Sequence, residues 1–269
     1  MTAPSDYYAF RGGAKRPHLD YAELQRLLSA VFKELEDKGW FQAELGKDCV
    51  DDRNDVGAIV LERLGHHFWP FSSSVANEEE QWVFTILEFA YGIAAKPVTS
   101  YVHDWNNCGV HVTGSDREAG RHEFRERINA LLVRYSTPYE LRENGEIWAV
   151  TPAGFEEIEP VPTGEPSIDD RVRSAIRAFR RFGANDDDRR HAIHDLADVF
   201  EYLRSTVGTQ LLSKDEGELF NIANNFGIRH HNPNQKTEYD SGVWLGWIFY
   251  TYLNTVDLVT KLLTREDNP

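Results

Sequence analysis

One short stretch of the chain gathers several side chains that can bind phosphate and move protons. Residues 224–235 are rich in amides and carry Arg229, His230 and His231 at their centre. An arginine can grip a phosphate through its forked donors, and histidine is the side chain that titrates near neutral pH. One histidine could accept a proton from an attacking hydroxyl and the other could protonate the leaving oxygen, while Arg229 stabilises charge on phosphorus. The pattern predicts a catalytic site for phosphodiester cleavage; the alternative is that these side chains cap helix ends and bind backbone carbonyls.

The residues around this stretch indicate how it is held. Gly227 can end the preceding helix in a left-handed cap, and Pro233 prevents an early restart of the next helix. We therefore expect a short loop between two packed helices. Apolar residues at helical spacing predict four helices in the second half, starting from an N-cap at Ser167 and at about residues 186, 214 and 238. The last is apolar nearly all round, so we expect it in the middle of a bundle.

The first of these helices also carries a row of arginines. Arg173, Arg177, Arg180 and Arg181 fall on one face, beside an apolar face. Several cations on one helix face can follow an RNA backbone, which makes this row a candidate nucleic-acid-binding surface. The alternative is a solvated face that pairs with the acidic run at residues 186–188.

Charge and composition exclude some classes of function. The net charge of -15 opposes non-specific binding to nucleic acid, and residues 1–164 hold 16 Lys and Arg against 27 Asp and Glu. A nucleic-acid contact is therefore expected in the second half. The 2 cysteines cannot form a disulfide framework, and the first residues lack a secretory apolar segment, which predicts a cytoplasmic protein. No apolar run reaches the roughly 20 residues that span a bilayer, so no membrane partner is expected.

The first half is predicted to be a separate, α-rich α+β domain, and the protein as a whole to be mainly α. Residues 156–166 combine three prolines with glycine and acidic residues, which is typical of a linker between domains at 1–155 and 167–269. Helices are predicted at about residues 20–38, 78–95 and 117–135. The Asn144-Gly145 pair predicts a β-hairpin near residues 139–150.

Three residues of the first half could in principle bind a metal. His103, Cys108 and His111 are spaced His-x4-Cys-x2-His, and Cys49 lies elsewhere in the same half. Zinc accepts these residue types, but the paired Cys-x2-Cys or His-x3-His arms of structural zinc sites are missing. We therefore interpret these residues as core or surface residues and predict neither a metal nor another cofactor.

The second half resembles the HEPN superfamily of all-helical domains. The resemblance covers roughly residues 167–264 and rests on two features. One is the helix that has acidic residues at its start, at about residue 186, and ends with residues 198–204; the other is Arg229-His230-His231-Asn232 ahead of the last helix. Members of this superfamily are common in bacterial toxins and abortive-infection proteins. Active members carry an arginine, usually followed by a polar residue, and then a histidine a few residues further on.

The resemblance implies a four-helix HEPN-like bundle and a metal-independent endoribonuclease of a toxin or phage-defence system. It also implies a homodimer, because active members pair to cut RNA, and a protein partner from the same operon. Arg229 and His230 match the start of the motif. The closing histidine does not, since Asn234, Gln235 and Lys236 stand there, so His231 would have to replace it. The alternative is a non-catalytic regulatory subunit that binds a nucleotide or a protein.

Overall fold

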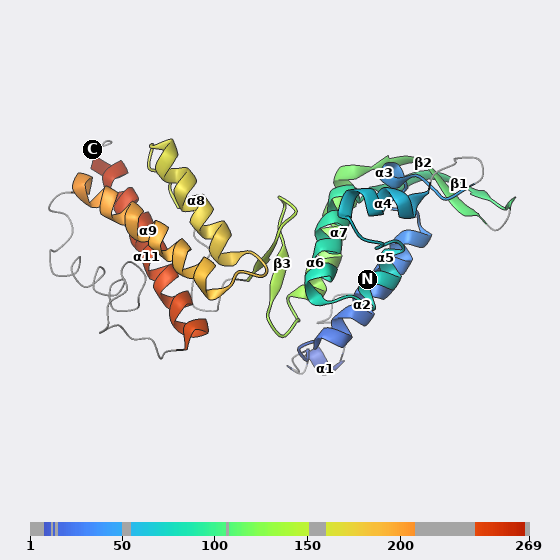
Figure 1. Cartoon of the computed structure of the whole chain (residues 1–269), viewed down its shortest axis with the longest axis horizontal. Helices are drawn as coiled ribbons and strands as arrows, with labels where there is room; N and C mark the ends of the chain where they lie inside the picture. The colour runs from blue at the N-terminus through green and yellow to red at the C-terminus, as the bar shows by residue number, and fades with distance from the viewer. Residues whose placement is uncertain are drawn as a thin grey trace. The chain divides into compact units, whose positions relative to one another are not determined.

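The chain divides into two compact units, residues 1–150 and 151–269. The computed structural model describes residues 8–11, 13, 16–49, 55–105, 108–150, 160–207 and 240–266. Both units are mainly helical, as the sequence predicts, and strands occur in unit 1 (Figure 1). No helix in the described part of the chain combines the length and apolar character needed to cross a bilayer.

α2 (Tyr21–Asp37) is the longest of the helices described in unit 1. α2 begins after Asp20, whose carboxylate accepts the backbone N–H of Glu23 while the Glu23 side chain accepts that of Asp20. This reciprocal capping box confirms the predicted start of the helix. The helices of unit 1 are α1 (Tyr8–Arg11), α2 (Tyr21–Asp37), α3 (Gln42–Leu45), α4 (Val56–Leu64), α5 (Phe71–Val75), α6 (Glu80–Ile93) and α7 (Arg117–Leu132).

Aromatic side chains make up the centre of the unit 1 core. The Phe32 ring of α2 lies 5.7 Å from that of Phe71 and 6.0 Å from that of Phe124, between ring centroids. Phe41 packs edge-on against Phe71 at 5.3 Å. All four rings are almost fully buried, so the core joins α2, α5 and α7 to the segment before α3.

Two small antiparallel sheets complete unit 1. β3 (Tyr139–Leu141) pairs with β4 (Ile147–Ala149), which confirms the hairpin predicted around Asn144-Gly145. β1 (Lys96–His103) pairs with β2 (Gly109–Asp116) in a second hairpin that the sequence analysis did not predict. Most side chains of β1 are exposed, and the hairpin extends beyond the helices of its unit (Figure 1).

Unit 2 contains α8 (Pro166–Arg180), α9 (Asp186–Val207) and α11 (Ser241–Glu266). The predicted N-cap at Ser167 is wrong, because the helix begins at Pro166 with Glu165 at the N-cap, where proline already has the helical φ. α9 packs against both α8 and α11. Phe179 of α8 stacks on Phe249 of α11 at 3.9 Å, so the three helices share one core.

Some predicted features of the second half lie outside the described residues. The helix predicted at about residues 214–226 and residues 156–159 of the predicted linker are among them. The rest of the predicted linker is described and belongs to unit 2. The backbone N–H of Thr163 donates to Asp169 at 2.7 Å, and that of Val161 donates to Asp257 at 3.3 Å.

Candidate metal centre

The catalytic residues predicted from the sequence, Arg229, His230 and His231, lie outside the described part of the chain. Their convergence stays a prediction.

The predicted arginine row of α8 is described. Arg173 forms a 2.5 Å ion pair with Asp170, and Arg181 pairs with Asp188 at 3.2 Å. Arg180 is only 6% exposed. The contact to Asp188 matches the alternative interpretation of pairing with the acidic run, and nucleic-acid binding by Arg173, Arg177, Arg180 and Arg181 remains a prediction.

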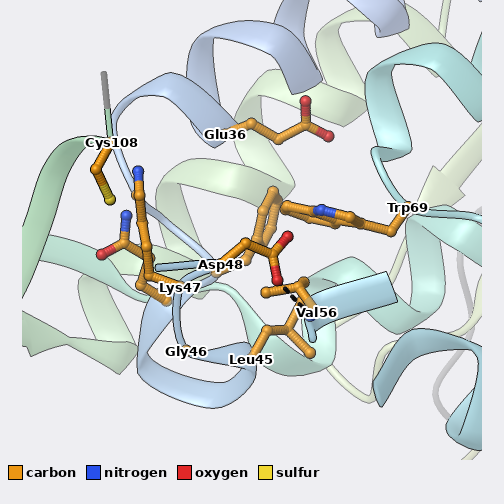
Figure 2. A pocket seen from close by; sticks show the side chains of 11 residues that line it. Glu36, Leu45, Gly46, Lys47, Asp48, Val56, Trp69 and Cys108 are labelled. Carbon is orange, nitrogen blue, oxygen red and sulfur yellow. Dashed lines mark hydrogen bonds between the residues drawn. The ribbon is translucent and has the colours of Figure 1, made fainter. Parts of the chain in front are cut away.

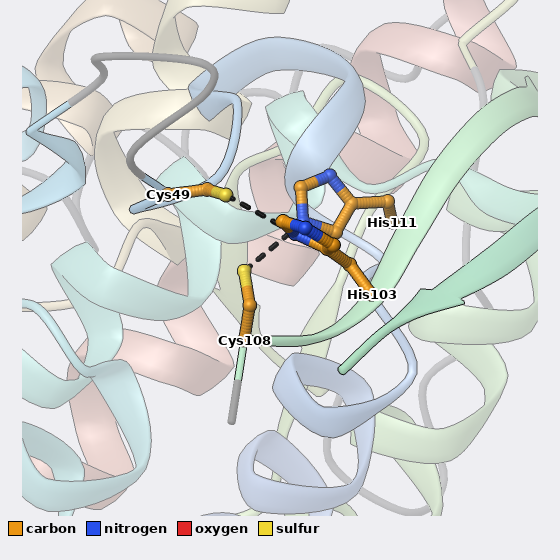
Figure 3. Close-up of side chains that lie close together, drawn as sticks. All are labelled: Cys49, His103, Cys108 and His111. Atoms are coloured by element: carbon orange, nitrogen blue, oxygen red, sulfur yellow. Dashed lines mark hydrogen bonds between the residues drawn. The ribbon is translucent and has the colours of Figure 1, made fainter. Parts of the chain in front are cut away.

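The structure does bring together four side chains that can bind a metal. One potential ligand atom from each of Cys49, His103, Cys108 and His111 lies within 4.8 Å of every other (Figure 3). The Cys49 sulfur is 3.5 Å from Nδ1 of His103, and the Cys108 sulfur is 3.0 Å from Nε2 of His111. His111 is buried at 5% exposure, and the other three are partly buried. Two thiols and two imidazoles thus face a common centre.

The β1–β2 hairpin positions three of these four residues. His103 ends β1 opposite Gly109, and His111 lies on β2 opposite Tyr101. Residues directly opposite each other point to the same face of a sheet, and so do residues two apart on one strand. His103, Tyr101 and His111 therefore share one face, and Cys108 reaches it from the residue before β2.

Ring contacts fix the orientation of the two imidazoles. Tyr101 stacks on His111 with 5.2 Å between centroids and 28° between planes. His103 meets His111 edge-on, also at 5.2 Å. These contacts restrict how far either imidazole can turn, which preorganises the pair for a shared ligand.

Cys49 comes from a different part of unit 1 and is held near the hairpin through α3. The Gln42 side chain donates to the carbonyl of Val110 at 2.9 Å and accepts the N–H of Val112 at 2.9 Å. Both bonds go to β2 on either side of His111. The segment after α3 therefore runs past the hairpin and delivers Cys49 to it.

The composition and spacing of the cluster fit zinc. In a tetrahedral site with zinc–sulfur bonds of about 2.3 Å and zinc–nitrogen bonds of about 2.0 Å, sulfur and nitrogen ligands lie about 3.5 Å apart. The cluster has sulfur–nitrogen distances of 3.5 Å and 3.0 Å. Two thiolates also balance the charge of Zn²⁺, which limits the cost of placing the ion in a partly buried site.

A pocket of about 330 Å³ borders the cluster, with Cys108 in its wall (Figure 2). Glu36, Asp48 and Trp69 extend toward its interior. Asp48 accepts the backbone N–H of Val56 at 2.7 Å, at the start of α4. Burial raises the pKa of Glu36 above its usual value, and hydrogen bonds from Ser72 partly oppose that increase. Cys108 is the one residue of the cluster that lines this pocket.

The sequence offers all four residues as possible ligands, but without the β1–β2 hairpin their convergence could not be predicted, and they were interpreted as core or surface residues. A signal was present: residues 98–102 and 110–113 are rich in valine, threonine and tyrosine and flank a polar turn. A hairpin predicted from that signal would place His103, Cys108 and His111 near its turn. Cys49 is 54 residues from His103 in sequence, and its approach depends on tertiary packing.

Comparisons of the chain with protein-family models, with curated proteins and with solved structures found no match.

Proposed function

We propose that unit 1 is a zinc-binding module in which Cys49, His103, Cys108 and His111 hold one Zn²⁺. The observation that carries this proposal is the convergence of four ligand atoms within 4.8 Å, contributed by two separate segments of the chain. Such a set of two thiols and two imidazoles is typical of zinc sites in proteins. Soft thiolates also disfavour calcium and magnesium, which prefer oxygen ligands.

The role that fits this ligand set is structural. Four protein ligands fill a tetrahedral coordination shell, whereas catalytic zinc sites keep one position open for water or substrate. An isolated two-stranded hairpin is only marginally stable in water. The zinc would stabilise the exposed β1–β2 hairpin by tying its end to the segment that follows α3.

Metal content tests this proposal directly. Protein purified without chelator should carry about one zinc per chain by mass spectrometry of the metal. The double variant Cys49→Ser/Cys108→Ser should lose it, because serine is a poor ligand for zinc. His67→Asn is the matched control, since His67 is an exposed histidine of the same unit outside the cluster. Equal zinc content in all three proteins would overturn the proposal.

Cobalt gives a second, spectroscopic test. Co²⁺ added to metal-free protein should produce the intense thiolate-to-cobalt absorption of a tetrahedral site. The bands should disappear on addition of zinc and be absent from the double cysteine variant. A spectrum unchanged by removal of both thiols would count against cysteine ligation.

We propose metal-independent RNA cleavage by unit 2 as a second candidate function. It is supported by the helical architecture of that unit, where α8, α9 and α11 share one core, as a HEPN-like domain requires. In this proposal Arg229 holds the scissile phosphate, and His231 or His230 moves protons. A homodimer would bring two such loops together.

Cleavage in the presence of EDTA separates this candidate from the zinc proposal. RNA incubated with the protein should be cut whether or not zinc is removed. Arg229→Ala should abolish cutting, and the control Arg171→Ala, which removes an arginine of α8 outside the predicted RNA-binding row, should leave it unchanged. Intact RNA together with thermal stabilisation by a nucleotide would instead favour the non-catalytic, nucleotide-binding alternative.

A further inference from the structure

A second pocket of unit 1 is lined by cations although the unit as a whole is acidic. This pocket has a volume of about 550 Å³ and lies along α7. Arg117, Arg121 and Arg125 occupy successive turns of that helix and all line it. The remaining lining residues are Tyr91, Glu118, His122 and Glu143.

Arg121 lies at the centre of the row and is held without a carboxylate partner among the described residues. One of its terminal nitrogens, Nη2, donates to the carbonyl of Gly92 at 2.8 Å. Its guanidinium lies 5.9 Å from the centroid of the Tyr91 ring. Its Nε is buried and has no hydrogen-bond partner in the described structure. Arg121 therefore lines the pocket with a positive charge that no carboxylate of the described residues neutralises, and such a charge favours an anionic ligand.

The two neighbouring arginines are paired, but with carboxylates that a ligand could displace. Arg125 pairs with Glu143 at 2.9 Å, and the Glu143 side chain is 81% exposed. An exposed ion pair contributes at most about 1 kcal/mol, so Glu143 can swing into solvent at little cost. Arg117 bonds Glu44 on α3, and its own side chain is 49% exposed. Arg121 and Arg125 are therefore the groups most available to an anion.

Phosphate groups match the chemistry and the spacing of these arginines. Guanidinium groups bind phosphate oxygens through two parallel hydrogen bonds. Arginines one turn apart are separated by about 6 Å along the helix axis, so neighbouring side chains can contact adjacent phosphate groups. Pockets for small ligands commonly measure about 300 to 1,000 Å³, a range that includes this one.

The charge of the surrounding chain limits the size of the ligand. Residues 1–164 hold 16 Lys and Arg against 27 Asp and Glu, which repels a long polyanion. A compact ligand that places its phosphates only in the pocket avoids most of that repulsion. We propose that this pocket binds the phosphate groups of a small phosphorylated molecule of nucleotide size. The proposal does not depend on the zinc site.

Titration calorimetry with pyrophosphate, ATP and adenosine tests it. Pyrophosphate and ATP should bind and adenosine should not, because the phosphates are the recognised groups. Arg121→Gln and Arg125→Gln should each weaken binding by about tenfold or more. Glu143→Gln should strengthen binding a few-fold, since it removes the carboxylate that competes for Arg125.

Arg127→Gln is the matched control, because Arg127 lies on the same helix and loses the same charge. It pairs with Glu34 and does not line the pocket. If Arg127→Gln and Arg125→Gln weaken binding equally, the loss of one positive charge is the cause whatever its position, and the proposal is overturned. Binding of adenosine as tight as that of ATP, binding of RNA but not of pyrophosphate, or no binding at all would also overturn it. Glu143→Gln changes an exposed side chain and Arg125→Gln a partly exposed one, so the test stands even if Arg121→Gln unfolds.

Discussion

Burial distinguishes His111 from the other residues of the metal cluster. Its side chain is 5% exposed, stacked on Tyr101 and within 3.0 Å of the Cys108 sulfur. Zinc binds the neutral form of imidazole. Cys49, at partial exposure, comes from the segment after α3 and closes the ligand set. The four side chains can therefore share one ion between the β1–β2 hairpin and the segment after α3.

Glu36 is a second residue whose environment has a measurable consequence. Its carboxylate accepts the backbone N–H of Ser72 at 2.9 Å and the Ser72 hydroxyl at 2.6 Å. Desolvation nevertheless dominates and raises the pKa of Glu36 above its usual 4.5. The folded state therefore binds this proton more tightly than the unfolded state does. Its stabilising contribution is complete below pH 4.5 and is lost as pH rises through the raised pKa.

Replacement of Glu36 by glutamine should remove this pH dependence. The free energy of unfolding of the wild type, measured relative to Glu36→Gln in urea, should fall as pH increases from about 5 to 8. Glu62→Gln is the control for the loss of one carboxylate, because Glu62 is exposed on α4. A wild type that gains stability relative to Glu36→Gln as pH rises would contradict the assigned cause.

At the scale of elements, the close approach of α7 to the start of β1 is essential to the placement of the hairpin. A Cβ atom on Gly120 would lie 2.5 Å from the backbone nitrogen of Lys96 and 2.6 Å from the Cα of Ala95. Real Cβ atoms do not approach backbone atoms so closely. Glycine at this position therefore allows the backbone of α7 to pack directly against the chain that enters β1.

Gly120→Ala should destabilise unit 1 by about 1 to 3 kcal/mol, the usual cost of overpacking a close contact. Gly92→Ala is the matched control, because Gly92 also lies in a helix and a Cβ there would meet no atom within 4 Å. That control should be neutral or stabilising by up to about 1 kcal/mol, because alanine favours helix. Urea unfolding curves measure both changes. A Gly120→Ala protein as stable as Gly92→Ala would contradict the packing described here.

The elements that the sequence predicted well are those with a strong local signal. α2 has a regular apolar face and a capping box, and the β3–β4 hairpin has an Asn-Gly turn. β1 offered neither signal, since both of its faces are largely exposed and its turn lacks such a pair. The N-cap of α8 is Glu165, two residues before the predicted Ser167. The valines, threonines and tyrosines of the β1–β2 hairpin were a local signal for three of the cluster residues, whereas the approach of Cys49 depends on tertiary packing of α3.

At the scale of the whole molecule, the two units have separate hydrophobic cores. The core of unit 2 consists of side chains from α8, α9 and α11. The proposed zinc ligands all belong to unit 1. A metal that binds only the folded form stabilises the unit that holds it and leaves the other unchanged.

Calorimetric unfolding should therefore show two transitions, of which a chelator shifts one. Removal of a ligand present at 1,000 times its Kd withdraws about 4 kcal/mol of stability, so the unit 1 transition should move to clearly lower temperature. The Cys49→Ser/Cys108→Ser protein identifies that transition, because it should resemble the chelated wild type without chelator. A chelator that shifts both transitions equally, or neither, would argue against a zinc site confined to unit 1.

X-ray absorption at the zinc edge of the purified protein tests the central claim most directly. We predict one zinc per chain with two sulfur atoms at about 2.3 Å and two nitrogen atoms at about 2.0 Å. A first shell made only of nitrogen and oxygen, or a protein that retains no zinc, would contradict the assignment of Cys49, His103, Cys108 and His111 as its ligands.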